Sequence, residues 1–392
     1  MSRKNIKEIT PPIETFANIK VVGVGGSGNS AINRMVKSKI RGVEFIAINT
    51  DAQALHHSIA PIKVHIGRET TKGLGAGMDP ELGTKSAEEN EQDIINALEG
   101  ANMVFITCGL GGGTGSGAAP IIADIARDLN ALTVAVITKP FTFEGIQRKD
   151  IAERSFDNLI DKVDAVITIP NDRLLQIIDK KTSLLEAFSI VDEVLKQGVQ
   201  GISEVITVPG LINVDFADVK AIMNQAGSAL MGIGTASGEN RAIEAAKAAI
   251  NSPLLELDIN GATGVLFTIA GSPDLTMFEV NEVAEIITAA CDSDAKIIFG
   301  AVVDEDLKDD IKVTVIATGF REAKENKMES NVAQSTISNH EVFAKKAEAR
   351  TIKKAFRKDS VKEEDDMIDV PKTKKEEELD MPTFLRNKIK NR

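Results

Sequence analysis

The strongest constraint on this chain is a glycine-rich stretch, Gly109 to Pro120, which reads GLGGGTGSGAAP. It follows the apolar run 103–108 and leads into the apolar segment 118–126, so we predict a buried strand that passes through glycines into a helix. Glycines leave room for backbone N–H groups to close on a ligand, and the helix N-terminus adds partial positive charge. The pattern therefore predicts an anion site, in particular a phosphate site, rather than a flexible turn.

A second glycine-rich turn lies near the start of the chain, after a predicted strand at 19–24. Gly23, Gly25 and Gly28 match G-x-G-x-x-G, which is typical of dinucleotide-binding folds when a helix follows. Taken alone, this pattern fits an NAD(P)-binding oxidoreductase of the Rossmann type. Two strand–loop–helix phosphate sites in one sheet favour a nucleoside triphosphate, so the oxidoreductase is kept as the alternative.

The sequence also limits how the phosphate charge can be balanced. It contains no G-x-x-x-x-G-K-[ST] pattern, which excludes a P-loop NTPase with a lysine on the terminal phosphates. The negative charge of the phosphates would have to be balanced by backbone amides, helix N-termini and a Mg²⁺ ion. The pattern of Cys and His residues predicts no zinc site, and we assign no protein side chain as a metal ligand.

Length and charge bound the class of protein. With 392 residues the chain can form two or three domains. No apolar run reaches the length of a membrane span and no signal peptide is evident, so we expect a cytoplasmic protein without a direct membrane span. Residues 321–392 hold 18 basic and 15 acidic side chains, and the rest of the chain has a net charge of −15. The strong negative charge of residues 1–320 argues against a nucleic-acid partner.

The stretch 109–120 resembles the glycine-rich signature of the tubulin/FtsZ family of GTPases, whose usual bacterial form has Met in place of Leu110 and Thr in place of Ser116. The resemblance covers about residues 12–320 and again 378–388. It implies a GTPase that binds GTP or GDP with Mg²⁺ and polymerises head to tail. Such filaments form the bacterial division ring at mid-cell, on the inner face of the membrane. A GTP-dependent scaffold with negligible turnover is a further alternative.

The predicted fold is α/β, with a Rossmann-like parallel-sheet GTPase domain, a long central helix, a smaller α+β C-terminal domain and a disordered tail. The predicted boundaries are a flexible N-terminal arm at 1–17, the GTP-binding domain at 18–181, the central helix at 182–205, an activation loop and C-terminal domain at 206–319, a disordered linker at 320–374 and a partner-binding peptide at 375–392.

The resemblance implies that both glycine-rich loops contact the nucleotide. The implied residues are Gly25, Gly26, Ser27, Gly28, Asn29, Ser30, Gly111, Gly112, Gly113, Thr114 and Gly115. Ser27 stands where the family usually has Gly, which adds bulk near the phosphates, and Ser30 stands where it usually has Asn. The loop 67–80 resembles the family loop that senses the terminal phosphate, and residues 85–98 after it are predicted to form one helix.

Five further side chains are implied to contact the sugar and base. Glu144 and Arg148 are four residues apart, and by themselves they indicate only a surface ion pair. The resemblance implies that Glu144 binds the ribose, that Arg148 lies by the nucleotide and that Asn171 reads the base. Phe188 and Asp192 share a helix face and would stack on a purine and pair with guanine, although a core phenylalanine and a solvated carboxylate fit the same pattern.

The stretch Asn213-Val214-Asp215-Phe216-Ala217-Asp218 has the form NxDxxD and enters a predicted helix. Asp215 and Asp218 are three apart and face the same way, which by itself favours an N-cap with a carboxylate near the helix dipole. The resemblance implies a catalytic role for Asn213, Asp215 and Asp218. In tubulin-like polymers this loop enters the neighbouring subunit's nucleotide site and positions the attacking water and magnesium.

The end of the chain differs in composition from the rest. Residues 320–374 lack glycine and are rich in charge, which predicts a disordered tether. An apolar cluster with basic residues then follows at 378–388. It resembles the family peptide that binds membrane-anchoring and regulatory division proteins. The implied partner-binding residues are Leu379, Asp380, Pro382, Phe384, Leu385 and Arg386.

Overall fold

The computed structural model describes residues 17–320 except 177, 179–180, 209, 256–258 and 305–306. The predicted N-terminal arm up to residue 16, the tether from residue 321 and the C-terminal peptide lie outside the described residues.

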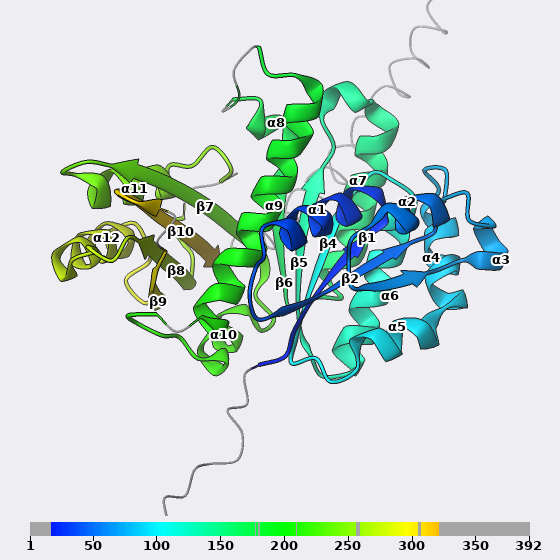
Figure 1. Cartoon of the computed structure of the whole chain (residues 1–392), viewed down its shortest axis with the longest axis horizontal. Helices are drawn as coiled ribbons and strands as arrows, with labels where there is room; N and C mark the ends of the chain where they lie inside the picture. The colour runs from blue at the N-terminus through cyan, green and yellow to red at the C-terminus, as the bar shows by residue number, and fades with distance from the viewer. Residues whose placement is uncertain are drawn as a thin grey trace, which may run out of the picture. The chain divides into compact units, whose positions relative to one another are not determined.

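Ten strands form one sheet in the order β3-β2-β1-β4-β5-β6-β7-β10-β8-β9 (Figure 1). The first six strands are all parallel, so their C-terminal ends lie at one edge of the sheet. These strands are β1 (Ile19–Val24), β2 (Val43–Asn49), β3 (Ile62–His65), β4 (Met103–Gly109), β5 (Leu132–Lys139) and β6 (Ala165–Pro170).

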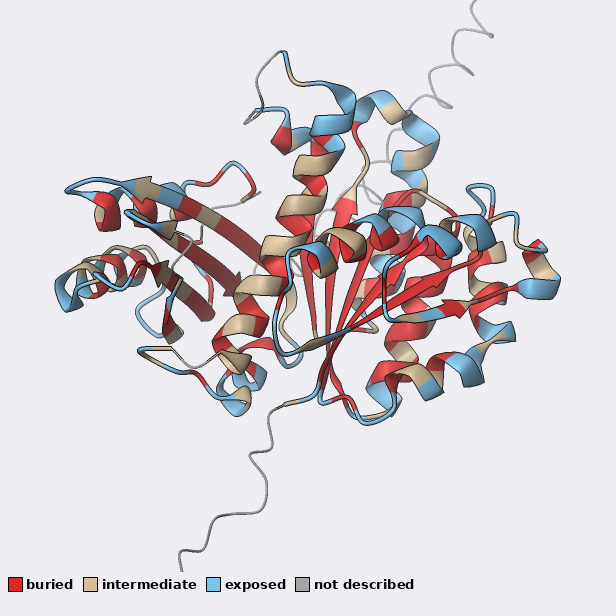
Figure 2. Cartoon of the chain, in the orientation of Figure 1, coloured by how far each residue is buried: buried red, intermediate tan, exposed pale blue. Residues whose placement is uncertain are grey.

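Helices cover both faces of this parallel part, and Figure 2 shows its strands as the buried middle layer. They are α1 (Gly25–Lys37), α2 (Ala52–His57), α3 (Arg68–Thr71), α4 (Pro80–Glu89), α5 (Glu91–Leu98), α6 (Thr114–Asp128), the 3₁₀ turn η1 (Thr142–Glu144), α7 (Ile146–Ile160), α8 (Asn171–Leu174) and α9 (Leu184–Thr207). Helices α1 and α9 pack in the core on one face, whereas α5, α6 and α7 pack on the other. Near-continuous apolar strands such as β5 fit this burial on both sides.

The smaller C-terminal part continues the same sheet. Its elements are α10 (Phe216–Met223), β7 (Gly227–Ser237), α11 (Arg241–Ile250), β8 (Gly264–Gly271), α12 (Met277–Ala289), β9 (Lys296–Val303) and β10 (Asp310–Thr318). Strand β7 pairs in parallel with β6 over three residues, and β10 lies antiparallel between β7 and β8. Helices α11 and α12 pack on β8 and β10 in a core of their own. The predicted α/β fold class is confirmed for the described residues.

Two local predictions need correction. The segment 85–98 is not one helix, because α4 ends at Glu89 and α5 begins at Glu91, with Asn90 outside helical geometry at φ −114° and ψ 28°. The turn at 25–30 is the start of helix α1, which begins at Gly25. Low helix propensity of glycine is overridden there by packing, since a Cβ on Gly28 would come within 2.4 Å of the Thr107 carbonyl oxygen.

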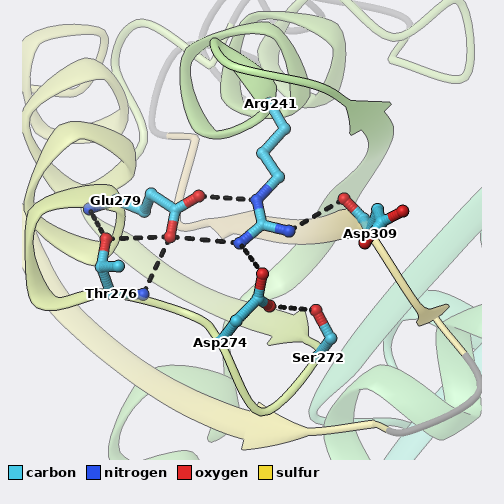
Figure 3. Close-up of polar contacts among 6 residues, drawn as sticks. All are labelled: Arg241, Ser272, Asp274, Thr276, Glu279 and Asp309. Atoms are coloured by element: carbon cyan, nitrogen blue, oxygen red, sulfur yellow. Dashed lines mark hydrogen bonds and ion pairs between the residues drawn. The ribbon is translucent and has the colours of Figure 1, made fainter.

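A buried arginine connects three segments of the C-terminal part (Figure 3). Arg241, at the start of α11, is 7% exposed, and its Nε lies 2.6 Å from Glu279 Oε1 in α12. Its Nη2 lies 3.2 Å from Asp274 Oδ2, and Nη1 donates to the Asp309 carbonyl at 2.9 Å. The hydrogen bond from Arg241 lowers the pKa of Glu279. The network fixes the first turn of α12, where Thr276 and Glu279 also form a reciprocal capping box.

We predict that Arg241→Ala lowers the free energy of unfolding by about 3 kcal/mol, because Glu279 would keep its charge in a largely buried place without its cationic partner. Urea unfolding followed by circular dichroism measures this, since the chain lacks Trp and Tyr. Arg154→Ala, which removes an exposed arginine on α7, is the control. A loss below about 1 kcal/mol for Arg241→Ala would show that the network contributes no more than a surface ion pair.

Candidate functional site

Two helix N-termini meet at the C-terminal edge of the parallel sheet. Strand β1 leads directly into α1, and its neighbour β4 leads through the signature into α6. Gly25, at φ +73°, lies so close to α6 that a Cβ on it would come within 3.1 Å of the Gly115 amide nitrogen. The first turns of both helices have N–H groups without intrahelical acceptors, so the edge presents two sets of donors and two positive dipole ends. This arrangement suits a phosphate chain.

Serine hydroxyls hold the two glycine loops in place. Ser27 Oγ accepts a hydrogen bond of 2.8 Å from the Gly109 N–H and thereby ties the first loop to the end of β4. Within the signature, Ser116 Oγ accepts one of 2.9 Å from the Gly111 N–H. The bulk of Ser27 is therefore directed at the neighbouring loop. The role of Ser116 could not be predicted, because it depends on the tight turn that brings this residue back to Gly111.

A second group of side chains lies along the same edge, at the ends of β5 and β6. Arg148 Nη1 lies 2.6 Å from Glu144 Oε2, and Glu144 Oε1 accepts a 2.9 Å hydrogen bond from the Phe141 N–H. The Phe188 ring, 41% exposed on α9, meets Phe141 edge-on at 5.8 Å between centroids. The first half of α9 is thus brought beside the 3₁₀ turn after β5, and the predicted Glu144–Arg148 ion pair is present.

Buried amides in this region lack partners within the described residues. Both side-chain amide atoms of Asn29 and the Oδ1 of Asn171 are buried without a hydrogen bond there, and the two residues are 3% and 5% exposed. A buried amide left unpaired costs roughly 1–3 kcal/mol, so such groups point to a polar ligand. Asn29 lies in the first glycine loop and Asn171 directly follows β6. Both positions were predicted to contact the nucleotide.

Asp192 has the electrostatic environment of a binding group. Burial raises its pKa to about 6, and the positive charge of Arg34 on α1 lowers the pKa in part. The Arg34 Nε is itself buried without a partner in the described part of the chain. Arg34 was not predicted, because only the packing of α1 against α9 brings it toward Asp192. An ionised Asp192 can accept hydrogen bonds from two N–H donors on one edge of a base.

The three predicted catalytic residues lie elsewhere. Asp215 is the N-cap of α10, with Oδ1 accepting a 2.8 Å hydrogen bond from the Asp218 N–H, and Asn213 Oδ1 accepts one of 2.6 Å from the Gly210 N–H. All three side chains belong to exposed residues. They follow the C-terminal end of α9, a helix of 24 residues and about 36 Å, whereas Phe188 and Asp192 lie in its first half (Figure 1). One chain does not bring the carboxylates to its own glycine loops.

The described residues contain no group of three or more His, Cys, Asp or Glu side chains placed to hold a metal ion. Around the glycine loops the donors are N–H groups, which suit phosphate oxygens rather than a cation. Among the same residues, no helix is both long and apolar enough to cross a membrane.

Comparison with known proteins agrees with this geometry. Residues 18–179 match the model of the Tubulin/FtsZ family GTPase domain, and 227–321 match that of the FtsZ family C-terminal domain. An empty FtsZ dimer from M. jannaschii is 47% identical with a TM-score of 0.76, over 78% of this chain and 89% of that one. CetZ2 from Haloferax volcanii, solved as a GTPγS-bound protofilament, is similar in fold at 22% identity and a TM-score of 0.67, over 83% and 99% of the two chains.

We predict that Asp192→Asn changes the base preference from guanine to xanthine, because an amide can donate to the O2 of xanthine where the carboxylate accepts from guanine. GTP affinity should fall about 100-fold, as expected for loss of charged hydrogen bonds in a buried place. Displacement of a fluorescent nucleotide analogue by GTP or XTP measures this.

The same interaction sets a pH dependence. On this prediction only the ionised form of Asp192 accepts both hydrogen bonds from guanine, so GTP affinity of the natural protein should decline as the pH falls through about 6, whereas the weaker GTP affinity of Asp192→Asn should not. Glu193→Gln, next to it on α9, is the control. Unchanged preference in Asp192→Asn would exclude Asp192 from base recognition.

Proposed function

The chain belongs to the tubulin/FtsZ family of GTPases, and we propose that its copies assemble head to tail so that each GTP is hydrolysed between two of them. The observation that carries this proposal is the length of α9. This helix keeps the loop that holds Asn213, Asp215 and Asp218 (the carboxylate loop) far from the glycine loops of the same chain. A carboxylate that acts on GTP must then come from a second copy. Membership of a GTPase family also removes the reason for an NAD(P)-dependent oxidoreductase.

In the proposed complex, the two glycine loops bind the phosphates of GTP through backbone N–H groups. Glu144 binds the ribose and Arg148 lies by the nucleotide, while Asn171, Phe188 and Asp192 recognise guanine. The unpaired Oδ1 of Asn171 and the partly buried carboxylate of Asp192 support these roles. The phosphates themselves would hold a Mg²⁺ ion, which supplies positive charge against the charge that develops during phosphoryl transfer.

Hydrolysis is proposed to occur by attack of a water molecule on the γ-phosphorus, while the bond from that phosphorus to the β–γ bridging oxygen breaks and GDP leaves. Asn213, Asp215 and Asp218 of the adjacent copy orient this water, and a carboxylate among them accepts its proton. The capping hydrogen bond holds Asp215 Oδ1 in place at the start of α10, which preorganises the loop. Such a general base contributes about 10²–10⁴ to the rate.

Exposed apolar side chains support self-assembly. Three large apolar side chains are exposed near the C-terminal edge of the parallel sheet. Leu74 is 86% exposed, Phe143 is 62% exposed and Ile146 is 79% exposed. Leu211 in the carboxylate loop is 61% exposed, and at the start of α12 the pair Met277 and Phe278 is also exposed. Large apolar side chains that gather on a surface mark contact sites. Contact between two different surfaces of identical copies gives an open filament, which agrees with the protofilament reported for CetZ2.

We further infer a role in cell division, from family membership. Filaments of this chain would lie in the cytoplasm and form the division ring at mid-cell. The peptide at 378–388, outside the described residues, would bind membrane-anchoring and regulatory proteins.

A two-nucleotide experiment tests whether the carboxylate loop acts on the neighbouring copy. The double variant Asp192→Asn, Asp215→Asn binds XTP, but its carboxylate loop lacks the Asp215 carboxylate. By itself, it should hydrolyse XTP at least 100-fold more slowly than the single variant Asp192→Asn. Addition of the natural protein with GTP should restore XTP hydrolysis, because its loop enters the XTP site of the double variant. Release of labelled phosphate from XTP measures this directly.

The controls separate assembly from catalysis. The natural protein alone should not hydrolyse XTP, and sedimentation should show both proteins in one polymer. If mixed polymer forms and XTP hydrolysis stays at the level of the double variant alone, the carboxylates act within their own chain or not at all.

A further inference from the structure

The loop at 67–79 lies directly on the start of the signature helix α6. A Cβ on Gly113 would come within 2.8 Å of the Ala76 Cβ and within 2.9 Å of the Asp79 amide nitrogen. Near its middle, the loop is tied to the start of α2 by the hydrogen bond from the Ala52 N–H to the Gly73 carbonyl oxygen, at 3.2 Å. A group added to the end of a phosphate chain at Gly113 would therefore meet this loop.

The loop is held in an unfavourable backbone conformation. Lys72 and Met78 have φ of +52° and +67°, in the left-handed region where a residue with a Cβ costs about 1–2 kcal/mol. Neighbouring glycines in the loop share that region without this cost. Such a conformation persists only where the surrounding contacts fix it.

Two side chains at the end of α4 fix the beginning of the loop. Glu89 Oε1 accepts from the Glu69 N–H at 2.9 Å, and Oε2 accepts from the Thr70 N–H at 3.1 Å and from its hydroxyl at 2.8 Å. Asn90 Oδ1 accepts from the Gly67 N–H at 2.8 Å. These bonds, led by that from Glu69, lower the pKa of Glu89, so the carboxylate is ionised at neutral pH.

The other end of α4 is packed against α6 without intervening side chains. A Cβ on Gly83 would come within 2.4 Å of the Gly113 carbonyl oxygen, and one on Gly117 within 2.0 Å of the Pro80 carbonyl oxygen. Asp79 caps the helix by accepting from the Glu81 N–H. Helix α4, about 15 Å long, thus contacts the signature at one end and binds the beginning of the loop at the other.

We propose that Glu89 is a positioning residue for the terminal phosphate: with Asn90, it fixes loop 67–79 to α4 so that the loop can distinguish GTP from GDP. When the γ-phosphate displaces the loop, the loop and α4 then move together as one rigid unit. The proposal rests on GTP as the bound nucleotide. It assigns to Glu89 no contact with the nucleotide itself.

The test compares Glu89→Gln with Glu88→Gln, the same change one position earlier, where the described residues give the carboxylate no partner. Affinities for GTP and GDP are measured by displacement of a fluorescent GDP analogue, at protein concentrations too low for polymer to sediment. Glu89→Gln should weaken GTP binding about fivefold and leave GDP binding within twofold. Glu88→Gln should match the natural protein for both. Asn90→Ala, which removes the second anchor, should also weaken GTP binding selectively.

The outcomes separate this proposal from the assembly proposal. Equal losses for GTP and GDP in Glu89→Gln would mean a general structural role and would overturn it, as would an unchanged GTP-to-GDP ratio in both Glu89→Gln and Asn90→Ala. A natural protein that binds GTP and GDP equally would remove the premise that the loop senses the γ-phosphate. None of these results depends on hydrolysis by a neighbouring copy.

Discussion

The close approach of two helix N-termini is the contact on which the rest of the molecule depends. Helices α1 and α6 start from adjacent parallel strands and approach closely at Gly25, where a Cβ would lie 3.1 Å from the Gly115 amide nitrogen. A Cβ on Gly115 would in turn lie 2.9 Å from the Gly109 carbonyl oxygen at the end of β4. The unpaired N–H groups of the two helices then point to one place, where phosphate oxygens can take up the positive dipole ends. The surrounding amides, the loop on Gly113 and the first half of α9 are all arranged around that edge.

Helix α9 gives the second constraint, which is one of distance. Its first half carries Phe188 and Asp192 beside the C-terminal edge of the parallel sheet, and its C-terminal end leads to the carboxylate loop. A rigid helix of this length makes base recognition and the proposed water activation incompatible within one copy. In the proposed assembly, stacking of two copies joins the two halves of the reaction, so turnover would depend on assembly.

Much of the fold could be predicted from the sequence, because the parallel strands are short apolar runs and two of them, β1 and β4, lead into glycine-rich loops. The family and the fold class are confirmed, and the structure places Asn171, Phe188 and Asp192 along the edge of the glycine loops; their roles, and the domain boundaries, stay predictions. The break at Asn90 could not be predicted, since helix periodicity continues through 85–98 and only the hydrogen bond that Asn90 Oδ1 accepts from the Gly67 N–H explains the turn. Two other features also could not be predicted: the approach of Arg34 to Asp192, and the hydrogen bond that Ser27 Oγ accepts from the Gly109 N–H. Both depend on tertiary packing between segments distant in sequence.

The measurement that tests the central proposal most directly is the rate of GTP hydrolysis per molecule as a function of protein concentration, with Mg²⁺ present and polymer followed by sedimentation. If the site is completed between copies, the rate is near zero below a threshold concentration and rises above it, and protein appears in the pellet at the same threshold. A constant rate per molecule with nothing in the pellet would contradict the proposal, because the nucleotide site would then be complete within one chain.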